Sequence, residues 1–524
     1  MTDAVGITVG ACVRAHGQVR NSRSAFLTPE AAVTWAAYDA GADSLAAMLV
    51  TAGVEPGDRV AVVMPDGPGV HAVYVGAERV GAVVVGIGFR AGLREIGYLV
   101  TKTGASLLVT EEGYRTDLAA EFPALRAMTV PHDLGSLGRS APPTGGGLGP
   151  DDLFLINSTS GTTGLPKCVM HAQRRWFAFH RWAVDAGALT EDEVVYSAIG
   201  APFGFGLWTA HVTPAVLGCP TVLADRFDAA MSLDLIERHR VTVLACVSTQ
   251  FIMMLEEQRA RPRDLSSLRC MFTGGESVPY GRAAEFEDRT GAVVLQFYGS
   301  NETGALSRTT VSDTRERRLR TAGHVLDEMN VRLFDTDGTD ITGEGRPGIP
   351  GCRGPATCLG YYGDDDANRR LLTPDGWMLM GDIVEIDDEG YLTVVGRSSD
   401  FIIRGGKNIS APQVEAEVAT HPGVAMVAAV AMPDDVFGER VCAYVEVRPG
   451  WEGLTLVDIT DHLASRGVTK EWFPEKLILV DSLPRSSGGK IAKGELRDDA
   501  LRRRRSVSGA VHELPDASPT DPVS

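Results

Sequence analysis

Short apolar runs alternate with amphipathic stretches along the first third of the chain. The run 58–64 (DRVAVVM) predicts a buried strand, the stretch 70–79 predicts a helix, and the run 82–87 predicts a second strand. Strands that are apolar on both faces are typical of parallel sheets covered by helices on each side. The pattern therefore predicts an α/β fold.

Further strands are predicted at 153–157, 221–223, 241–247 and 293–297. The last two run into Ser, Thr or Gly, and ligands usually bind at such strand ends in α/β sheets. A Gly- and Pro-rich stretch at 141–150 (APPTGGGLGP) predicts a surface connection before the first of these strands.

From about residue 382 the pattern changes to shorter β segments. A hairpin turn is predicted at 387–390 (DDEG), with a returning strand at 391–395, and a smaller domain is expected to begin near Arg397. Its predicted elements are strands at 424–431 and 441–447 and a helix at 458–466. The last residues are rich in Ser, Pro and Asp and predict a disordered tail.

The composition is that of a globular protein with more than one domain. A length of 524 residues exceeds what one hydrophobic core supports. No run reaches the roughly 20 apolar residues that cross a bilayer, and the first residues lack a secretory pattern, so we expect a cytoplasmic protein. The eight cysteines show no CxxC or metal-ligand spacing, and we interpret them as reduced and mostly buried. A net charge of -18 argues against nucleic-acid or anionic-membrane partners, which require a basic face.

The strongest chemical signal is the loop 158–167 (STSGTTGLPK), which directly follows a predicted buried strand. Its hydroxyls, glycines and backbone N–H groups suit the wrapping of phosphate oxygens, and its lysine adds positive charge. The glycine spacing differs from that of a Walker loop. The candidate phosphate-binding residues are Thr159, Ser160, Gly161, Thr162, Thr163, Gly164 and Lys167.

This loop resembles the phosphate loop of the adenylate-forming superfamily, which includes acyl- and aryl-CoA ligases, luciferases and the adenylation domains of peptide synthetases. The resemblance extends over about residues 57–496, with the motifs in the family's order, and is greatest to a stand-alone bacterial acyl-CoA ligase. It implies a large N-terminal α/β part of several subdomains and a small mobile α+β C-terminal domain. The implied division is an ATP- and acyl-binding domain at 1–396, a hinge at 397–400 that includes Ser399, a lid at 401–505 and a tail at 506–524.

The resemblance also implies a nucleotide site. Tyr298 would stack on the adenine, Glu302 would hold Mg²⁺ beside the phosphates, and Asp382 with Arg397 would fix the ribose. The remaining implied nucleotide-binding residues are Gly274, Gly275, Glu276, Gly299 and Ser300.

Lys490, in the stretch 484–493 (PRSSGGKIAK), resembles the family's adenylation lysine. Its ammonium would offset negative charge as the carboxylate meets the α-phosphate, so the implied catalytic residues are Lys490, Glu302 and Asn301. The stretch Arg404, Gly405, Gly406 and Lys407 resembles the hairpin that lines the pantetheine tunnel of CoA ligases. A simple hairpin turn is the alternative for that stretch.

Several positions depart from the family's pattern. Asn301 stands where the family usually has Thr, whose hydroxyl contacts the α-phosphate, and Cys168 replaces a Gly. Ser399 replaces the usual Asp or Lys of the hinge. The acyl-pocket stretch 200–208 (GAPFGFGLW) has Phe203 or a neighbour in place of His. The expected acyl-pocket residues are Phe203, Gly204, Phe205, Gly206 and Phe297. An apolar wall with glycines favours a roomy hydrophobic pocket, although the glycines could instead serve strand packing.

The resemblance therefore implies an AMP-forming acyl-CoA ligase that alternates between two domain orientations. Its substrates would be a bulky hydrophobic carboxylic acid, ATP with Mg²⁺, and coenzyme A. One alternative is an enzyme with impaired adenylation that mainly converts a preformed acyl-AMP to the thioester. A free-standing loader of a carrier protein is another, and a non-catalytic nucleotide sensor would not need Lys490. A homodimer is left open.

Overall fold

The computed structural model describes residues 7–115, 117–138, 140–141, 145–158, 166–276, 278–397, 401–404, 407–434, 436–485 and 490–508. Contacts divide the chain into a larger unit, Met1–Val395 with Arg485–Lys490, and a smaller unit, Gly396–Pro484 with Ile491–Ser524. The chain is a mixed α/β protein with a large N-terminal and a small C-terminal part, which confirms the predicted fold class. The finer boundaries and the hinge expected at 397–400 stay predictions.

The first sheet of the larger unit has six strands. In spatial order they are β6 (Arg126–Val130), β5 (Leu107–Glu111), β3 (Arg59–Val62), β4 (Val83–Gly86), β7 (Leu153–Ser158) and β8 (Cys168–Ala172). All neighbours are parallel except β7 and β8. Every residue of β4 and β5 is buried, as expected for strands with layers on both faces. The predicted apolar strands are confirmed.

The second sheet has nine strands. In spatial order they are β15 (His324–Val325), β14 (Gly304–Arg308), β13 (Val293–Ser300), β12 (Cys270–Gly274), β11 (Val243–Ala245), β9 (Val195–Ser197), β10 (Thr221–Val222), β1 (Ser24–Leu27) and β2 (Ala32–Thr34). The run from β1 to β13 is parallel, so these strands end at one edge of the sheet. β11 is shorter than the predicted 241–247, and the next helix, α10, begins at Ser248.

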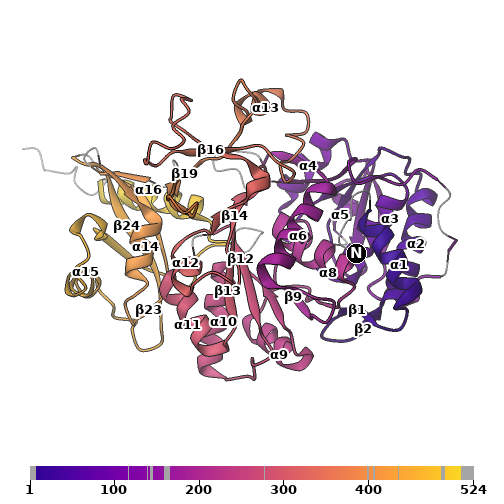
Figure 1. The fold of residues 1–524 in the computed structure, drawn as a ribbon, viewed down its shortest axis with the longest axis horizontal. Coiled ribbons are helices and arrows are strands. Elements are labelled where there is room, and N and C mark those ends of the chain that lie inside the picture. The colour runs from indigo at the N-terminus through magenta and orange to yellow at the C-terminus, as the bar shows by residue number, and fades with distance from the viewer. Residues whose placement is uncertain are drawn as a thin grey trace, which may run out of the picture. The chain divides into compact units, whose positions relative to one another are not determined.

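Helices cover both sheets (Figure 1). They are α1 (Val9–Val19), α2 (Trp35–Thr51), α3 (Pro68–Arg79), α4 (Leu93–Thr103), α5 (Leu118–Glu121), α6 (Arg174–Gly187), α8 (Thr213–Leu217), α9 (Ala229–His239), α10 (Ser248–Ala260), α11 (Tyr280–Thr290) and α12 (Arg315–Arg320). The stretch 200–208 contributes a single turn, α7 (Gly204–Gly206), that runs into a π-helix, η2 (Leu207–Val212).

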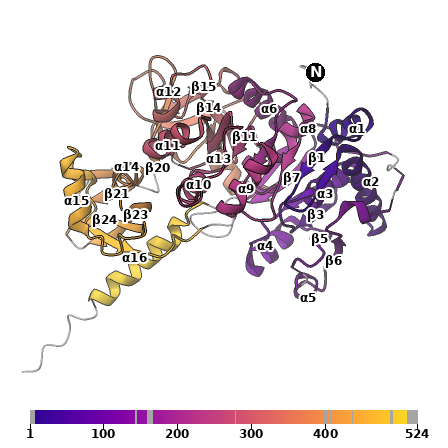
Figure 2. The ribbon, with the colours of Figure 1, turned by 90° about the horizontal axis from the view of Figure 1, so that it is seen from below.

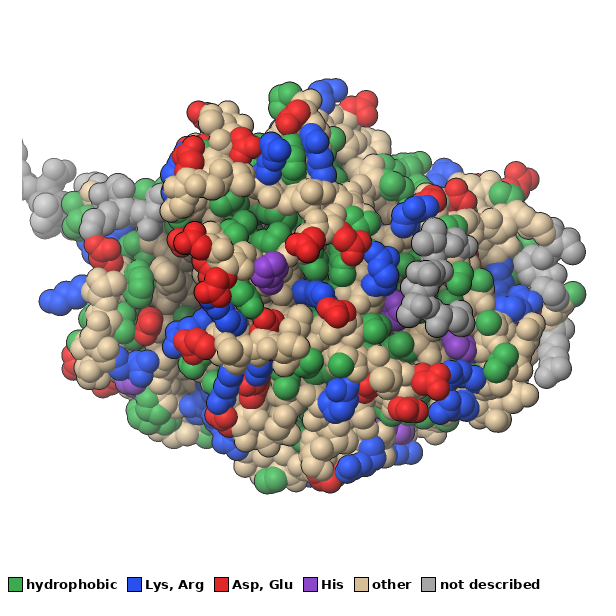
Figure 3. All heavy atoms as spheres, viewed as in Figure 1, with side chains coloured by type: hydrophobic (Ala, Val, Ile, Leu, Met, Phe, Trp, Pro, Cys, Tyr) green, Lys and Arg blue, Asp and Glu red, His purple; other side chains and the backbone are tan. Residues whose placement is uncertain are grey.

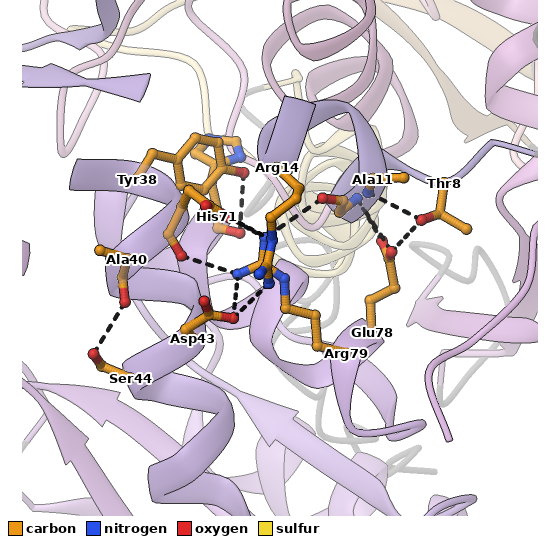
Figure 4. A network of polar contacts seen from close by, with 12 residues as sticks. Thr8, Ala11, Arg14, Tyr38, Ala40, Asp43, Ser44, His71, Glu78 and Arg79 are labelled. Atoms are coloured by element: carbon orange, nitrogen blue, oxygen red, sulfur yellow. Dashed lines mark hydrogen bonds and ion pairs between the residues drawn. The ribbon is translucent and has the colours of Figure 1, made fainter. Parts of the chain in front are cut away.

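A polar network ties α1, α2 and α3 together (Figure 4). Asp43 of α2 accepts from Arg14 of α1 at 2.7 Å and from Arg79 of α3 at 2.8 Å. The side chains of Asp43 and Arg79 are both largely buried, so the paired charges replace the water that each has lost. This network fixes the three helices against one another.

The remaining described part of the larger unit consists mainly of short β segments and one α-helix. These are β16 (Val331–Phe334), β17 (Ile349–Cys352), β18 (Met378–Leu379) and α13 (Asp365–Leu371), followed by the hairpin of β19 (Asp382–Ile386) and β20 (Leu392–Arg397), which ends at the start of the smaller unit. The Asp387 N–H donates to the carbonyl of Tyr391, and Gly390 has φ +82°. The predicted turn at 387–390 is confirmed.

The smaller unit is a five-stranded sheet with helices. Its elements are β21 (Phe401–Arg404), β22 (Lys407–Ser410), β23 (Val424–Asp434), β24 (Gly438–Val447), β25 (Lys476–Leu479), α14 (Ala411–Val418), α15 (Leu456–Ser465) and α16 (Lys493–Ser508). Figure 2 shows α16 as a long helix that packs against β23. The helix runs past residue 505, and the remainder of the predicted tail, 509–524, lies outside the described residues.

Three features of the interior and the surface bear on the composition. All eight cysteines are unpaired and buried, which confirms their expected burial. The face drawn in Figure 3 carries acidic and basic side chains interspersed. Among the described residues, no helix is long and apolar enough to cross a membrane.

Candidate functional site

The predicted phosphate loop lies between β7 and β8. Thr159, Ser160, Gly161, Thr162, Thr163 and Gly164 fall outside the described residues. Lys167 is described, and its Nζ lies 4.6 Å from the centre of the Tyr361 ring, a cation–π contact.

Tyr361 also contacts the predicted metal ligand. Its hydroxyl donates to Glu302 Oε1 at 2.8 Å, and the Glu302 carbonyl accepts from the Cys358 N–H at 2.7 Å. Burial and the Glu302 charge raise the pKa of Tyr361, so the phenol stays a hydrogen-bond donor. The structure thus brings Lys167 and Glu302 together around one aromatic ring that no sequence motif indicated.

The carboxylate of Glu302 is a suitable ligand for the expected Mg²⁺ ion. One carboxylate, completed by substrate phosphates and waters, is a common protein contribution to a Mg²⁺ site. No group of three or more His, Cys, Asp or Glu side chains that could hold a metal occurs in the described part of the chain.

Asn301, the predicted catalytic residue beside Glu302, is held on both its side chain and its backbone. Its Nδ2 donates to Asn157 Oδ1 at 2.7 Å, and its carbonyl accepts from Arg175 at 2.9 Å. Asn157 and Arg175 were not among the predicted site residues. The only sequence sign was an amide near the end of an otherwise apolar strand.

The predicted adenine turn follows β12. A Cβ on Gly274 would lie 2.2 Å from the Phe297 carbonyl, so only glycine fits there. Gly275 has φ +75°, and a Cβ on it would lie 2.8 Å from Lys490 Nζ. Both belong to the larger unit, so the predicted adenylation lysine lies beside the predicted adenine turn. Glu276 instead accepts from the Thr249 N–H at 3.1 Å, which anchors the turn to the start of α10.

Two further predicted nucleotide residues meet directly. The Tyr298 hydroxyl donates to Asp382 Oδ2 at 2.7 Å, which joins β13 to β19. A Cβ on Gly299 would lie 1.8 Å from the Gly304 carbonyl, while the Ser300 hydroxyl accepts from the Glu302 N–H at 3.2 Å. Both residues shape the turn that carries Glu302. Arg397 is the last residue of β20, and its side chain lies outside the described atoms.

The predicted CoA hairpin lies in the smaller unit. Arg404 of β21 pairs with Lys407 of β22, while Gly405, Gly406 and the hinge residue Ser399 lie outside the described residues. The Arg404 guanidinium contacts Glu475 at 3.2 Å and the Glu471 carbonyl at 2.9 Å. These contacts hold its side chain within the smaller unit.

The glycines of the predicted acyl-pocket stretch are closely packed. A Cβ on Gly206 would lie 2.3 Å from two backbone carbonyls, and one on Gly204 would lie 2.9 Å from Trp176. These glycines allow close packing, which is the alternative that the sequence left open for them, and the acyl-pocket assignment stays a prediction. The wall itself is aromatic, because Trp208 packs 5.2 Å from Phe297 and 5.4 Å from Phe205. Phe203 lines a cavity of about 60 Å³ nearby.

The sequence matches two family models and is similar to several known proteins. Residues 13–362 match the family described as AMP-binding enzyme, and residues 413–490 match its AMP-binding enzyme C-terminal domain. The chain is 29% identical to a medium-chain fatty-acid–CoA ligase of Escherichia coli over 90% of this chain and 87% of the relative. It is 30% identical to an indoleacetate–CoA ligase of Aromatoleum aromaticum over 93% and 97%, respectively.

A solved structure shares the fold over almost the whole length. An anthranilate–CoA ligase in complex with anthranoyl-AMP superimposes with a TM-score of 0.87, covers 96% of this chain and 99% of its own, and has 23% sequence identity.

Proposed function

Because the chain belongs to the AMP-binding enzyme family, we propose that it converts a hydrophobic carboxylic acid to its coenzyme A thioester through an acyl-adenylate. It is an AMP-forming acid–thiol ligase, and CoA ligases of this family use ATP, Mg²⁺ and CoA. The observation that carries the residue assignments is the position of Lys490 Nζ beside Gly275 of the adenine turn.

In the first half-reaction, a carboxylate oxygen attacks the α-phosphorus of ATP. A P–O bond forms, the bond to pyrophosphate breaks, and acyl-AMP results. Lys490 offsets the negative charge of both reactants, and Lys167 binds phosphate oxygens. Glu302 would hold Mg²⁺, which would neutralise phosphate charge when bound. Asp382, oriented by Tyr298, accepts the ribose hydroxyls.

In the second half-reaction, the CoA sulfur attacks the acyl carbon, the thiol proton is lost, and the bond to AMP breaks. Adenylation makes this step feasible because AMP leaves far more readily than a carboxylate oxygen. We assign the pantetheine arm to the hairpin of Arg404, Gly405, Gly406 and Lys407, and the exchange of Lys490 for this hairpin to rotation about 397–400.

The aromatic wall supports a hydrophobic acid. Phe205, Trp208 and Phe297 form one cluster of stacked and tilted rings, an apolar environment that favours an apolar acyl group beside it. The names of two relatives, one for a medium-chain fatty acid and one for indoleacetate, agree with acids of this class. The cytoplasmic location and the homodimer stay predictions.

The test is product formation from four probe acids, octanoate, phenylacetate, cinnamate and 1-naphthoate, with Mg-ATP and CoA. We expect AMP, pyrophosphate and a product with the mass of the CoA thioester of one of these acids. Absence of any thioester, both from the free acids and from their supplied adenylates, would refute the proposal.

A second function is favoured by one observation, Asn301, which stands where the family resemblance implies a Thr. In that case the enzyme is silent with free acids and forms the thioester only from supplied acyl-adenylates. If acyl-AMP accumulates and CoA is not acylated, a carrier-protein thiol becomes the acceptor to test.

A further inference from the structure

A chain of buried polar groups runs from Arg175 to Asn301 in the larger unit. Asn157 and Asn301 are 144 residues apart in sequence, and His171 lies on β8, next to the strand that carries Asn157. Arg175, His171 and Asn157 expose 2%, 0% and 4% of their surfaces. Buried polar groups of this kind are costly unless they are hydrogen-bonded, so their arrangement is strongly determined.

The donor and acceptor roles along this series of hydrogen bonds follow from the groups at its two ends. The Pro202 carbonyl can only accept, so the Asn157 amide nitrogen, 3.0 Å away, donates to it. Asn157 Oδ1 therefore points the other way and accepts from both His171 Nε2 and Asn301 Nδ2, each at 2.7 Å. At the far end, an Arg175 N–H donates to His171 Nδ1.

His171 is thus a neutral imidazole with its proton on Nε2. Burial and the Arg175 charge keep its pKa well below the usual value. A protonated ring would have no acceptor at Nδ1, where the guanidinium donates. The ring is consequently a fixed donor toward Asn157 at neutral pH.

These bonds decide how the Asn301 amide lies. One of its N–H groups is committed to Asn157 Oδ1, and its own Oδ1 accepts from Asn157 Nδ2 at 3.4 Å. The second N–H is then oriented by the same bonds. A phosphate oxygen is an acceptor, so an oriented N–H can bind one.

We propose that Asn157 is a positioning residue for adenylation, which acts by fixing the Asn301 amide as a donor beside Glu302. The inference rests on the proposed function and deepens it, because it explains how the enzyme adenylates with Asn301. Through Pro202, the same amide also ties this donor to the turn that leads into the acyl wall.

The test separates the two half-reactions in four enzymes: wild type, Asn157→Leu, Asn301→Ala and the double variant. Adenylation is measured as ATP–pyrophosphate exchange with the best of the four probe acids. Thioester formation is measured from the supplied adenylate of that acid with CoA. Thermal midpoints are compared with Gln173→Leu, which removes a carboxamide of similar burial that bonds Val9 and Glu78.

We expect Asn157→Leu to slow exchange at least tenfold and to leave thioester formation within twofold of wild type. Because Asn157 acts through Asn301, adding Asn157→Leu to the Asn301→Ala variant should lower its exchange rate by less than twofold. Gln173→Leu should lower the thermal midpoint and leave the ratio of the two rates unchanged.

Other outcomes overturn the assignment. A full tenfold loss in the Asn301→Ala background means that Asn157 does not act through Asn301, and an equal loss in both half-reactions means that its role is structural. A wild type that is silent in exchange yet forms thioester from the adenylate overturns this inference alone. A wild type silent in both assays overturns the proposed function instead.

Discussion

The Tyr298 hydroxyl donates a hydrogen bond to Asp382 Oδ2 across 2.7 Å. The two residues come from β13 and β19, which belong to different sheets. Asp382 is 5% exposed, so the phenol is a substantial part of what replaces water around this carboxylate. The predicted adenine-stacking residue therefore also orients the predicted ribose-binding residue.

Loss of this hydrogen bond should weaken ATP binding. Tyr298→Phe keeps the ring and removes the donor, and a hydrogen bond to a charged group is worth about 1.5–3 kcal/mol, which corresponds to a rise of about tenfold or more in KM for ATP. The measurement is the initial rate against ATP concentration. Tyr391→Phe is the matched control, because it removes a Tyr–Asp bond of 2.5 Å to Asp313. Equal KM values for the two variants would contradict the assignment.

Lys490→Ala should affect only one half-reaction. Removing one charge-stabilising donor from an active site typically costs about 10²–10³-fold in rate, so ATP–pyrophosphate exchange should fall by that factor. Thioester formation from supplied acyl-adenylate should stay near the wild-type rate. Lys493→Ala, which removes a lysine paired with Glu415 at 2.7 Å, is the control. Exchange at the wild-type rate in Lys490→Ala would remove this residue from the chemistry.

Gly206→Ala should destabilise the fold. The added methyl would lie 2.3 Å from the carbonyls of Ile199 and Gly200, and overpacking by one carbon against backbone costs about 1–3 kcal/mol or more. Gly200→Ala in the same turn is the control, because its Cβ would meet nothing closer than 3.7 Å. Thermal unfolding of the two variants measures the difference, and similar midpoints would contradict the packing described here.

His180 should make the protein less stable in mild acid. Burial lowers its pKa in the folded state from 6.5 to about 4, and its Nδ1 has no hydrogen-bond partner among the described residues. The unfolded chain therefore takes up a proton below pH 6.5, whereas the folded chain does not until about pH 4. The stability contribution is present above pH 6.5 and is lost as the pH falls toward 4.

His180→Phe removes this dependence. Between pH 7 and pH 5, the apparent free energy of unfolding should fall by about 2 kcal/mol less in the variant than in wild type, because one pKa unit corresponds to 1.36 kcal/mol. Urea denaturation followed by tryptophan fluorescence at both pH values gives the comparison. An unchanged pH dependence would mean that the folded state protonates His180 normally.

The strands and motifs are local in sequence, and for that reason they could be predicted. The apolar run 82–87 forms β4, because a strand buried on both faces is marked by a few adjacent apolar residues. Residues 387–390 form the expected turn, because a Gly that can adopt a positive φ is also a local feature. The order of the motifs along the sequence was likewise enough to predict the family.

The sequence could not predict which residues of different motifs lie close together in space. Nothing in the sequence places Asn157 against Asn301 or Tyr361 against Glu302, because strand register and turn geometry, not sequence spacing, decide which side chains meet. The glycines of 200–208 show the same limit. Their pattern was compatible with an open pocket or with close packing, and only the neighbouring carbonyls and Trp176 decided for packing.

The sequence by itself thus determined the fold class, the family and the kinds of side chain that the chemistry requires, since these follow from local composition and order. The tertiary structure decided which of those side chains share a site and how their protons are arranged, as in the chain from Arg175 to Asn301. The physical reason is that hydrogen-bond direction and desolvation depend on neighbours brought together by packing.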